Sequence, residues 1–261
     1  MTHQTVSSLP VDMTGVRVII SAGAAGIGRA MADAFAARGG KVYVCDIDPK
    51  AIAECGHAGI VADMGRVEDV DRFMDAALTA LGGVDVLINN AGIAGPVAPI
   101  ERIQPAELDA VLNVNLASQF HCARSAVPAL RQSGRGCVIN ISSAAGKFGF
   151  SQRTSYSATK WGVIGLTRSL AIELGPDKVR VNAILPGFVE GPRARAVMEA
   201  KAQEAGVSAE TFMAQALSRF SLRCTVSAQD ISNMALYLAS PFGATITGQA
   251  ISVDAGMESM T

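Results

Sequence analysis

A tyrosine and a lysine, Tyr156 and Lys160, stand four residues apart in the segment SYSATKWG, residues 155–162. On a helix, residues at this spacing share one face, so the phenol and the ammonium would lie close together. A free phenol, with a pKa near ~10, is a poor base at neutral pH, but a cation within about 4–6 Å lowers that pKa by roughly 1–3 units. The pair could therefore exchange a proton with an alcohol or a ketone. An isolated pair of this kind is more commonly a surface contact.

Other polar groups occur where such chemistry would need them. Ser142 and Ser143 follow the apolar run VINI, a position from which a hydroxyl can bond a substrate oxygen. Asn113 and Asn115 fall inside a long expected helix, where asparagine has a poor propensity and needs a reason such as a link to water. Serine nucleophile chemistry is not favoured, because the sequence has no G-x-S-x-G elbow, and we assign the three histidines no role.

A glycine-rich turn, SAGAAGIG (21–28), follows the apolar run VRVII. Glycines at this place let a pyrophosphate approach the backbone N–H groups at a helix start, although the turn alone could also be an ordinary tight turn. Asp46 ends the next apolar run and could accept hydrogen bonds from an adenosine ribose. Because it would repel a 2′-phosphate, it favours NAD over NADP. Asp63 could reach an adenine amino group or form an Asx turn, and we expect Asn89 and Asn90 to tie loops together.

The elements that must position these groups form an alternating pattern. Short runs that are hydrophobic throughout indicate strands covered on both faces of a parallel sheet, and segments of helical period lie between them. This alternation predicts a doubly wound α/β sheet whose ligand lies beyond the carboxyl ends of the strands. The expected strands are 16–20, 41–45, 59–62, 84–88, 136–141, 179–185 and 249–253, and the expected helices are 27–38, 68–81, 105–132, 155–175 and 228–240.

Residues 188–227 make a longer connection than one crossover helix requires, and we expect a helical substrate lid there. The chain has 261 residues, 49% hydrophobic and 17% charged, with a net charge of −1. We expect one domain over 1–261, with no pull toward nucleic acid or a membrane. The five scattered cysteines predict neither disulfides nor a metal site, and they favour the cytoplasm. The N-terminal segment has no signal-peptide pattern.

The order of the glycine turn, Asp46, NNAG, Asn115, Ser143 and YSATK resembles the short-chain dehydrogenase/reductase family over essentially the whole chain. The resemblance implies a one-domain Rossmann fold of seven parallel strands. It also implies hydride transfer between a nicotinamide cofactor and a carbonyl or secondary alcohol, in a homotetramer or dimer paired through 105–132 and 155–175. Tyr156 would be the general acid/base and Ser143 would orient the substrate oxygen. Lys160 would hold the nicotinamide ribose and lower the tyrosine pKa, and Asn115 would hold a water.

The same resemblance implies a set of cofactor contacts and two departures from the family pattern. Ala22 replaces a glycine, and we expect it to adopt negative φ and tolerate its methyl group. Gly191 replaces a threonine that would bond the nicotinamide carboxamide, and Ser21 replaces a threonine with little consequence. The implied cofactor-binding residues are Ser21, Gly23, Gly26, Ile27, Gly28, Asp46, Ile47, Asp63, Met64, Asn90, Ala91, Gly92, Tyr156, Lys160, Pro186, Gly187 and Val189.

The substrate is predicted from the expected pocket walls. Arginine suits a carboxylate, so we predict an NAD-dependent enzyme acting on CH–OH groups of a sugar, sugar acid or hydroxy acid. The lid arginines could instead be solvated, and we expect Trp161 in the core or a subunit contact. A 3-oxoacyl-thioester reductase and a non-catalytic NAD-sensing or scaffold protein are the alternatives. The candidate substrate residues are Ser143, Ala144, Ala145, Phe148, Arg153, Phe188, Arg193 and Arg195.

Overall fold

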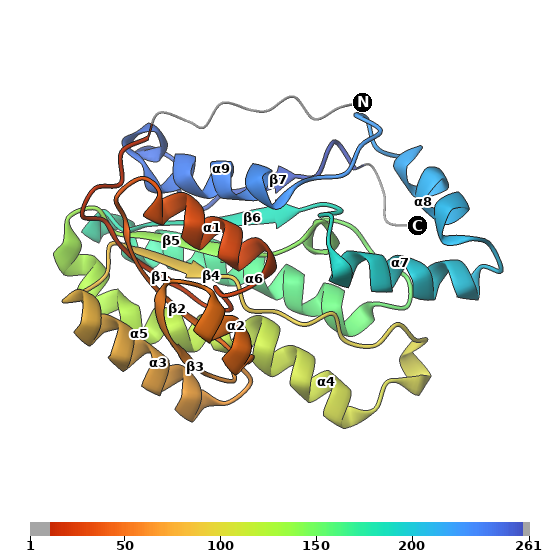
Figure 1. Cartoon of the computed structure of the whole chain (residues 1–261), viewed down its shortest axis with the longest axis horizontal. Coiled ribbons are helices and arrows are strands. Elements are labelled where there is room, and N and C mark those ends of the chain that lie inside the picture. Colours follow the sequence, from red (N-terminus) through yellow and green to blue (C-terminus); the bar gives the residue numbers. More distant parts are fainter. Residues whose placement is uncertain (1–10, 258–261) are drawn as a thin grey trace.

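A parallel sheet of seven strands, in the order β3-β2-β1-β4-β5-β6-β7, forms the centre of the protein (Figure 1). The computed structural model describes residues 11–257. The predicted doubly wound α/β fold is confirmed, and each predicted strand is present to within two residues. The strands are β1 (Arg17–Ile20), β2 (Lys41–Asp46), β3 (Ala58–Val61), β4 (Val86–Asn89), β5 (Cys137–Ile141), β6 (Arg180–Pro186) and β7 (Ala250–Val253).

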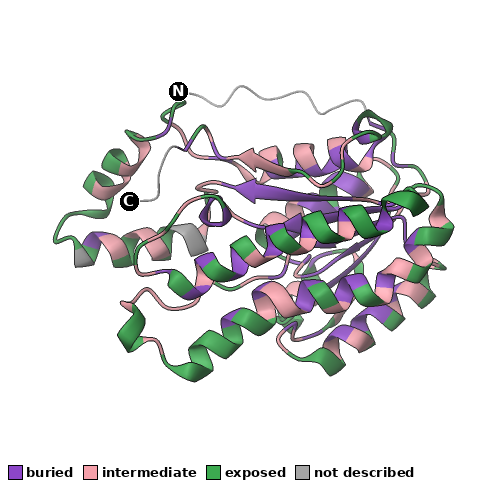
Figure 2. Cartoon of the chain, turned by 180° about the vertical axis from the view of Figure 1, so that it is seen from behind, coloured by how far each residue is buried: buried purple, intermediate pink, exposed green. Residues whose placement is uncertain are grey.

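Helices cover both faces of the sheet, which explains why the strands are apolar throughout. Val18 and Ile20 of β1 pack in a core with helices α1 (Gly26–Ala36) and α9 (Ala228–Ala239). Ile19, which points the other way, packs in a second core with α3 (Val67–Leu81), α5 (Ser118–Ser133) and α6 (Thr154–Leu174). Figure 2 shows buried residues concentrated on the strands and on the inward sides of these helices.

The chain reverses its direction across the sheet at β1, which pairs with β2 on one side and β4 on the other. The loops that follow β1 and β4 therefore start next to each other, and the N–H of Ser21 donates to the carbonyl of Ile88 over 3.1 Å. Such a switch point, at the carboxyl ends of the strands, is where open α/β sheets bind their ligands. The glycine turn and the NNAG segment consequently meet at this edge.

Two helical features differ from the sequence expectation. A short helix, α2 (Pro49–Glu54), was not predicted, and Asp48 caps it by accepting from the N–H of Lys50 over 2.8 Å. The helix expected over 105–132 is α4 (Pro105–Leu112) and α5 joined by a π turn, Asn113–Ala117. Short 3₁₀ turns lie at Ile100–Arg102, Ala144–Gly146, Gly175–Asp177 and Pro241–Gly243.

The long connection 188–227 contains two helices, α7 (Pro192–Glu204) and α8 (Ala209–Leu217). Figure 1 shows both of them beyond the end of β6. The side chain of Ser208 accepts from the N–H of Thr211 and so starts α8, while an isolated bridge between Val189 and Val226 ties the two ends of the connection together. Within residues 11–257, none of the helices has the length and apolar character needed to span a bilayer.

Candidate active site

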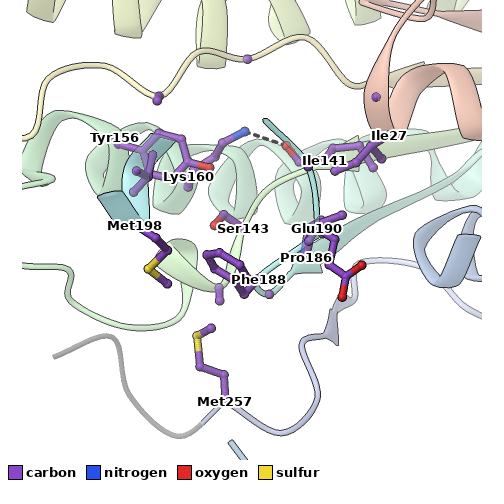
Figure 3. Close-up of a pocket in the computed structure, with 18 of the residues that line it drawn as sticks. Ile27, Ile141, Ser143, Tyr156, Lys160, Pro186, Phe188, Glu190, Met198 and Met257 are labelled. Carbon is purple, nitrogen blue, oxygen red and sulfur yellow. Dashed lines mark hydrogen bonds between the residues drawn. The ribbon is translucent and has the colours of Figure 1, made fainter. Parts of the chain in front are cut away.

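A cavity of about 610 Å³ lies between the carboxyl ends of the strands and the two helices α7 and α8. It runs from the glycine turn after β1, past the ends of β4, β5 and β6, to the side chains of α7 and α8. Figure 3 shows Ser143, Tyr156 and Lys160 lining one part of this space, with Phe188, Met198 and Met257 around another. The sheet thus brings together residues that are far apart in the sequence.

Tyr156 and Lys160 both come from α6 and both line the cavity. The ammonium nitrogen of Lys160 lies 5.7 Å from the centre of the Tyr156 ring and donates to the carbonyl of Ile141 over 2.9 Å (Figure 3). Lys160 is only 3% exposed, so water screens the charge of its ammonium group poorly. The hydroxyl of Ser142 in turn donates to the carbonyl of Lys160 over 2.8 Å, which fixes this turn of α6 against β5.

Ser143 directly follows Ser142 beyond the end of β5 and lines the cavity. Its Oγ accepts from the N–H of Ala145 over 3.2 Å, and this bond caps the 3₁₀ turn that follows. A hydroxyl held in this way can still donate its own proton to a substrate oxygen.

Asn115 lies in the π turn and is fully buried. Its Oδ1 accepts from the N–H of Ile93 over 2.7 Å, and its Nδ2 donates to the Ile93 carbonyl over 3.1 Å. The side chain therefore holds the loop after β4, and it is not among the residues that line the cavity. These bonds explain why an asparagine is favoured at this place within a helix. π turns of this kind often occur at functional sites.

The glycine turn is bound to the loop after β4. Ser21 Oγ accepts from the N–H groups of Asn90 and Ala91, each over 3.0 Å. The amide of Asn90 donates to the carbonyls of Ser21 and Ala22 over 3.1 and 2.9 Å. Asn90 ties the two loops together as predicted, and it also lines the cavity.

The expectation for Ala22 was wrong, because this residue has φ +49° and lies in the left-handed region. The backbone must turn sharply here, and a Cβ at Gly28 would collide with the Ala22 carbonyl. An alanine in this conformation costs roughly 1–2 kcal/mol, a cost that glycine avoids. The departure from the family pattern is thus a point of backbone strain beside the cavity.

The cofactor end of the cavity fits a dinucleotide. Gly26 lines it with φ +53°, and a Cβ at Gly26 would meet no protein atom within 4 Å. A ligand can therefore approach this backbone closely at the start of α1. Asp46 also lines the cavity and is 9% exposed, with its carboxylate accepting from the N–H groups of Asp48 (3.3 Å) and Ala24 (3.4 Å). These bonds fix the position of the Asp46 carboxylate at the end of β2.

The other predicted cofactor residues divide into two groups. Asp63 does not line the cavity, and its Oδ1 accepts from the N–H of Gly65 over 2.8 Å in the Asx turn that was the alternative interpretation. Met64 lines a separate cavity of about 380 Å³. Predicted residues that line the main cavity are Gly26, Ile27, Asp46, Asn90, Gly92, Tyr156, Lys160, Pro186, Gly187 and Val189; those that do not are Ser21, Gly23, Gly28, Ile47, Asp63, Met64 and Ala91.

The predicted substrate residues also divide. Ser143, Ala144, Arg153 and Phe188 line the cavity. The prediction for Ala145 has to be corrected, because this residue is completely buried and does not line the cavity. The prediction for Phe148 has to be corrected too, because its side chain packs against a small apolar cluster of Ala144, Phe220 and Met257 and does not line the cavity.

The outcomes for the two arginines predicted in the connection 188–227 and for Trp161 differ. The side chain of Arg193 lies outside the described residues. Arg195 is exposed and does not line the cavity. Trp161 is 53% exposed, so it is not a core residue.

Several lining residues were not found from the sequence, mainly in the connection 188–227. Phe212, Ala216 and Phe220 are spaced four residues apart, so an apolar stripe in the connection 188–227 was the available signal. Gly191 has φ +155°, a conformation that threonine cannot adopt easily, which explains the second departure from the family pattern. The lining residues missed include Ala94, Ile141, Phe150, Glu190, Val197, Met198, Lys201, Phe212, Gln215, Arg219, Phe220 and Met257.

Known proteins resemble this chain over nearly its whole length. A family model described as enoyl-(acyl carrier protein) reductase matches residues 22–258. The chain is 35% identical to a probable galactose dehydrogenase of Rhizobium meliloti, over 94% of this chain and 96% of that one. It is 32% identical to D-beta-hydroxybutyrate dehydrogenase of Cupriavidus necator, over 94% and 98%. The structure of carveol dehydrogenase from Mycobacterium avium in complex with NAD superimposes with a TM-score of 0.88 at 28% identity, over 95% and 99%.

Proposed function

Because the chain belongs to the short-chain dehydrogenase/reductase family and is an oxidoreductase of CH–OH groups, we propose that it transfers hydride between NAD and the secondary alcohol of a small polar substrate. The observation that carries the proposal is the pair of Tyr156 and Lys160, with Ser143, on one cavity. The substrate class we favour is a sugar, sugar acid or hydroxy acid.

In the proposed reaction, the phenolate of Tyr156 accepts the hydroxyl proton of the substrate as the alcohol becomes a carbonyl. Ser143 donates a hydrogen bond to the reacting oxygen and thereby orients it. Lys160 favours the phenolate by its charge, and it is kept in place by its bond to Ile141. The nicotinamide, when bound, supplies the hydride acceptor. Asn115 holds the loop that contains Ile93 in place beside the site. Its role in a water relay stays a prediction.

NAD is favoured over NADP by Asp46. Its carboxylate lines the cavity where the ribose of a dinucleotide would lie, and a second negative charge on that ribose would be repelled. Its bonds to the N–H groups of Asp48 and Ala24 keep the carboxylate at this place.

Polar side chains that line the same cavity as Tyr156 favour a polar substrate. Arg153 lines the cavity and comes from the same end of α6, and Gln215 and Arg219 extend from the lid connection. The named activities of the two curated relatives, on galactose and on D-beta-hydroxybutyrate, support the same class. Apolar lid residues such as Val197, Met198 and Phe212 would exclude water when the substrate is bound.

We also propose a homo-oligomer, a tetramer or dimer, that works in the cytoplasm. Leu108, Leu112 and Phe120 are exposed along α4 and α5, and Trp161 and Ile172 are exposed on α6. Large apolar side chains exposed on these three helices favour burial against a second copy. The unpaired cysteines fit a reducing compartment.

The test is a screen of polyols, aldoses, aldonic acids, hydroxy acids and steroids with NAD and with NADP, monitored by the absorbance of the reduced nicotinamide. We expect NAD-dependent oxidation of a sugar, sugar acid or hydroxy acid. Faster turnover with NADP would contradict the cofactor assignment. Preference for a steroid, or for a 3-oxoacyl thioester in the reverse direction, would contradict the substrate class. Tight NAD binding without turnover of any alcohol would favour the non-catalytic alternative.

A further inference from the structure

Five side chains form a continuous stack from the lid to the active-site lysine, which we term the stacked row: Lys201, Phe150, Arg153, Tyr156 and Lys160. Lys201 Nζ of α7 lies 4.1 Å from the centre of the Phe150 ring. The guanidinium carbon of Arg153 lies 5.3 Å from that ring centre and 4.5 Å from the centre of the Tyr156 ring. Cations and aromatic rings alternate along the row, an arrangement in which each contact is attractive.

Arg153 is the central member of the row, and its position is fixed. The residue is 3% exposed, and its Nη2 donates to the carbonyl of Ala94 in the loop after β4 over 2.8 Å. Its own N–H donates to the carbonyl of Phe150, and its carbonyl accepts from the N–H of Ser157. The guanidinium therefore stays against the tyrosine ring while joining the turn before α6 to the β4 loop.

The charge of Arg153 acts directly on Tyr156. Its guanidinium carbon lies closer to the ring centre than the ammonium of Lys160 does, at 4.5 against 5.7 Å. A positive charge at such a distance favours the phenolate over the phenol. The planar guanidinium can also lie against two rings at once, which the compact ammonium of lysine does less well. Other charged groups that line the same cavity are Asp46, Lys160, Glu190, Lys201 and Arg219.

We propose that Arg153 is a positioning residue for Tyr156, holding its ring and favouring its phenolate, and that the lid acts on this arrangement through Lys201 and Phe150. The proposal rests on the proposed role of Tyr156 for its meaning in catalysis. The arrangement itself can be tested without a substrate. When the lid moves Lys201 away from Phe150, the row loses its outer member and Arg153 loses part of its support. Lid closure and preparation of the base would then be one event.

The chain suits a direct measurement, because it contains only three tyrosines. The absorbance of tyrosinate is followed against pH in the wild-type protein and in Tyr156→Phe, and the difference gives the titration of Tyr156 alone. Arg153→Gln removes the charge while keeping a donor for the Ala94 carbonyl, and Arg153→Lys keeps the charge. Lys147→Met is the matched control. Lys147 Nζ lies 4.9 Å from the Phe148 ring centre in a similar contact, and Lys147 does not line the cavity.

We expect Arg153→Gln to raise the midpoint of the Tyr156 titration by roughly 1 pH unit. In Arg153→Lys the midpoint should stay close to the wild-type value, because the positive charge is kept. In Lys147→Met the midpoint should be unchanged. Phe150→Leu and Lys201→Met should raise it by smaller amounts. An unchanged midpoint in Arg153→Gln overturns the proposal. Equal shifts in Arg153→Gln and Lys147→Met overturn it too, because the effect would then be one of general charge. Unchanged midpoints in both Phe150→Leu and Lys201→Met overturn the part played by the lid.

Should Arg153→Gln fail to fold, Phe150→Leu becomes the deciding variant for the whole proposal, since it removes the ring that supports the guanidinium from its far side. An unchanged midpoint in that variant overturns the proposal. If the substrate screen found no alcohol that the protein oxidises, that result would count against the proposed function. It would not affect the titration of Tyr156.

Discussion

Lys160 Nζ lies 5.7 Å from the centre of the Tyr156 ring, one helical turn away along α6, and it is buried by the ends of the strands. This relationship separates the pair from the many tyrosine–lysine pairs that lie on helix surfaces. Tyr156→Phe keeps the ring and its packing but removes the hydroxyl that we propose as the acid/base group. We expect turnover to fall roughly 10²–10⁴-fold, while NAD binding, measured by calorimetry, changes little.

Tyr237→Phe is the matched control for that variant, because Tyr237 stacks on Phe242 and does not line the cavity. It should retain wild-type turnover. If Tyr156→Phe were as active as this control, the assignment of the acid/base residue would be wrong.

Asp46→Ala removes the carboxylate from the end of β2. We expect the kcat/KM ratio for NAD over NADP to fall by at least about tenfold, since the loss of roughly 1.4 kcal/mol of repulsion and ribose binding corresponds to that factor. Steady-state kinetics with both cofactors measure the ratio. Asp48→Ala serves as the control at the neighbouring acid, which caps α2 and does not line the cavity. A ratio that falls equally in both variants would point to a general effect of charge.

Ala22→Gly should relieve backbone strain beside the glycine turn. The relief is roughly 1–2 kcal/mol, and the greater freedom of glycine in the unfolded chain offsets about 0.4–1 kcal/mol of it. We therefore expect a rise of up to about 1.6 kcal/mol in the free energy of unfolding, at roughly 2–4 °C in Tm for each kcal/mol, and NAD binding that is no weaker. Ala25→Gly is the control, because Ala25 has φ −140° and is unstrained. A lower Tm for Ala22→Gly would show that the left-handed alanine carries no strain.

The acid stability of the protein should depend on Asp85. Burial would raise the pKa of this carboxyl, but hydrogen bonds from the side chain and N–H of Arg17 outweigh burial and lower the pKa. A lowered pKa in the folded state means that the stabilisation is complete above the unfolded value of about 3.9 and is lost as the pH falls through the folded value. Arg17→Met should cost about 3 kcal/mol near neutral pH, measured by urea unfolding.

In that variant, the loss of stability between about pH 5 and the folded pKa should also be smaller than in wild type, since Asp85 no longer keeps its lowered pKa. Arg131→Met is the control, because Arg131 pairs with Asp177 at the surface, and it should change stability by less than about 1 kcal/mol. Wild-type and Arg17→Met curves that stay parallel from neutral to acid pH would contradict the assignment.

The thiols should differ sharply in reactivity. Burial raises the pKa of Cys45 to about 12 and also raises the pKa of Cys122 and Cys137. Cys55 is buried as well, and Cys224 is partly exposed. Since the thiolate is the reactive form, a thiol reagent at mildly alkaline pH should label Cys224 quickly and the other four only after unfolding. Cys224→Ser should abolish the fast phase, and a fast phase that persists would show that the core opens locally.

The fold was predictable because the strands are covered on both faces and are therefore continuous apolar runs. Such runs can be recognised in the sequence without knowing which strands pair. The order of Ser143, Tyr156 and Lys160 was equally visible, since their spacing is local. Ala22 was mispredicted because its φ depends on contacts outside its own turn, since its carbonyl accepts from the Asn90 amide over 2.9 Å and lies against Gly28, where there is no room for a Cβ. The row from Lys201 to Tyr156 could not be predicted, because it depends on where α7 lies relative to α6.

The strand order has a consequence for how the chain folds. Arg17 begins β1, the strand beside the central strand β4, and its partner Asp85 immediately precedes β4, so the two lie 68 residues apart in sequence. The first three strands can pair with one another as soon as they exist, but one edge of β1 stays open until β4 has been synthesised. Closing this gap is entropically costly and should slow folding. An apolar strand edge is thus exposed during synthesis, when a chaperone could shield it from aggregation.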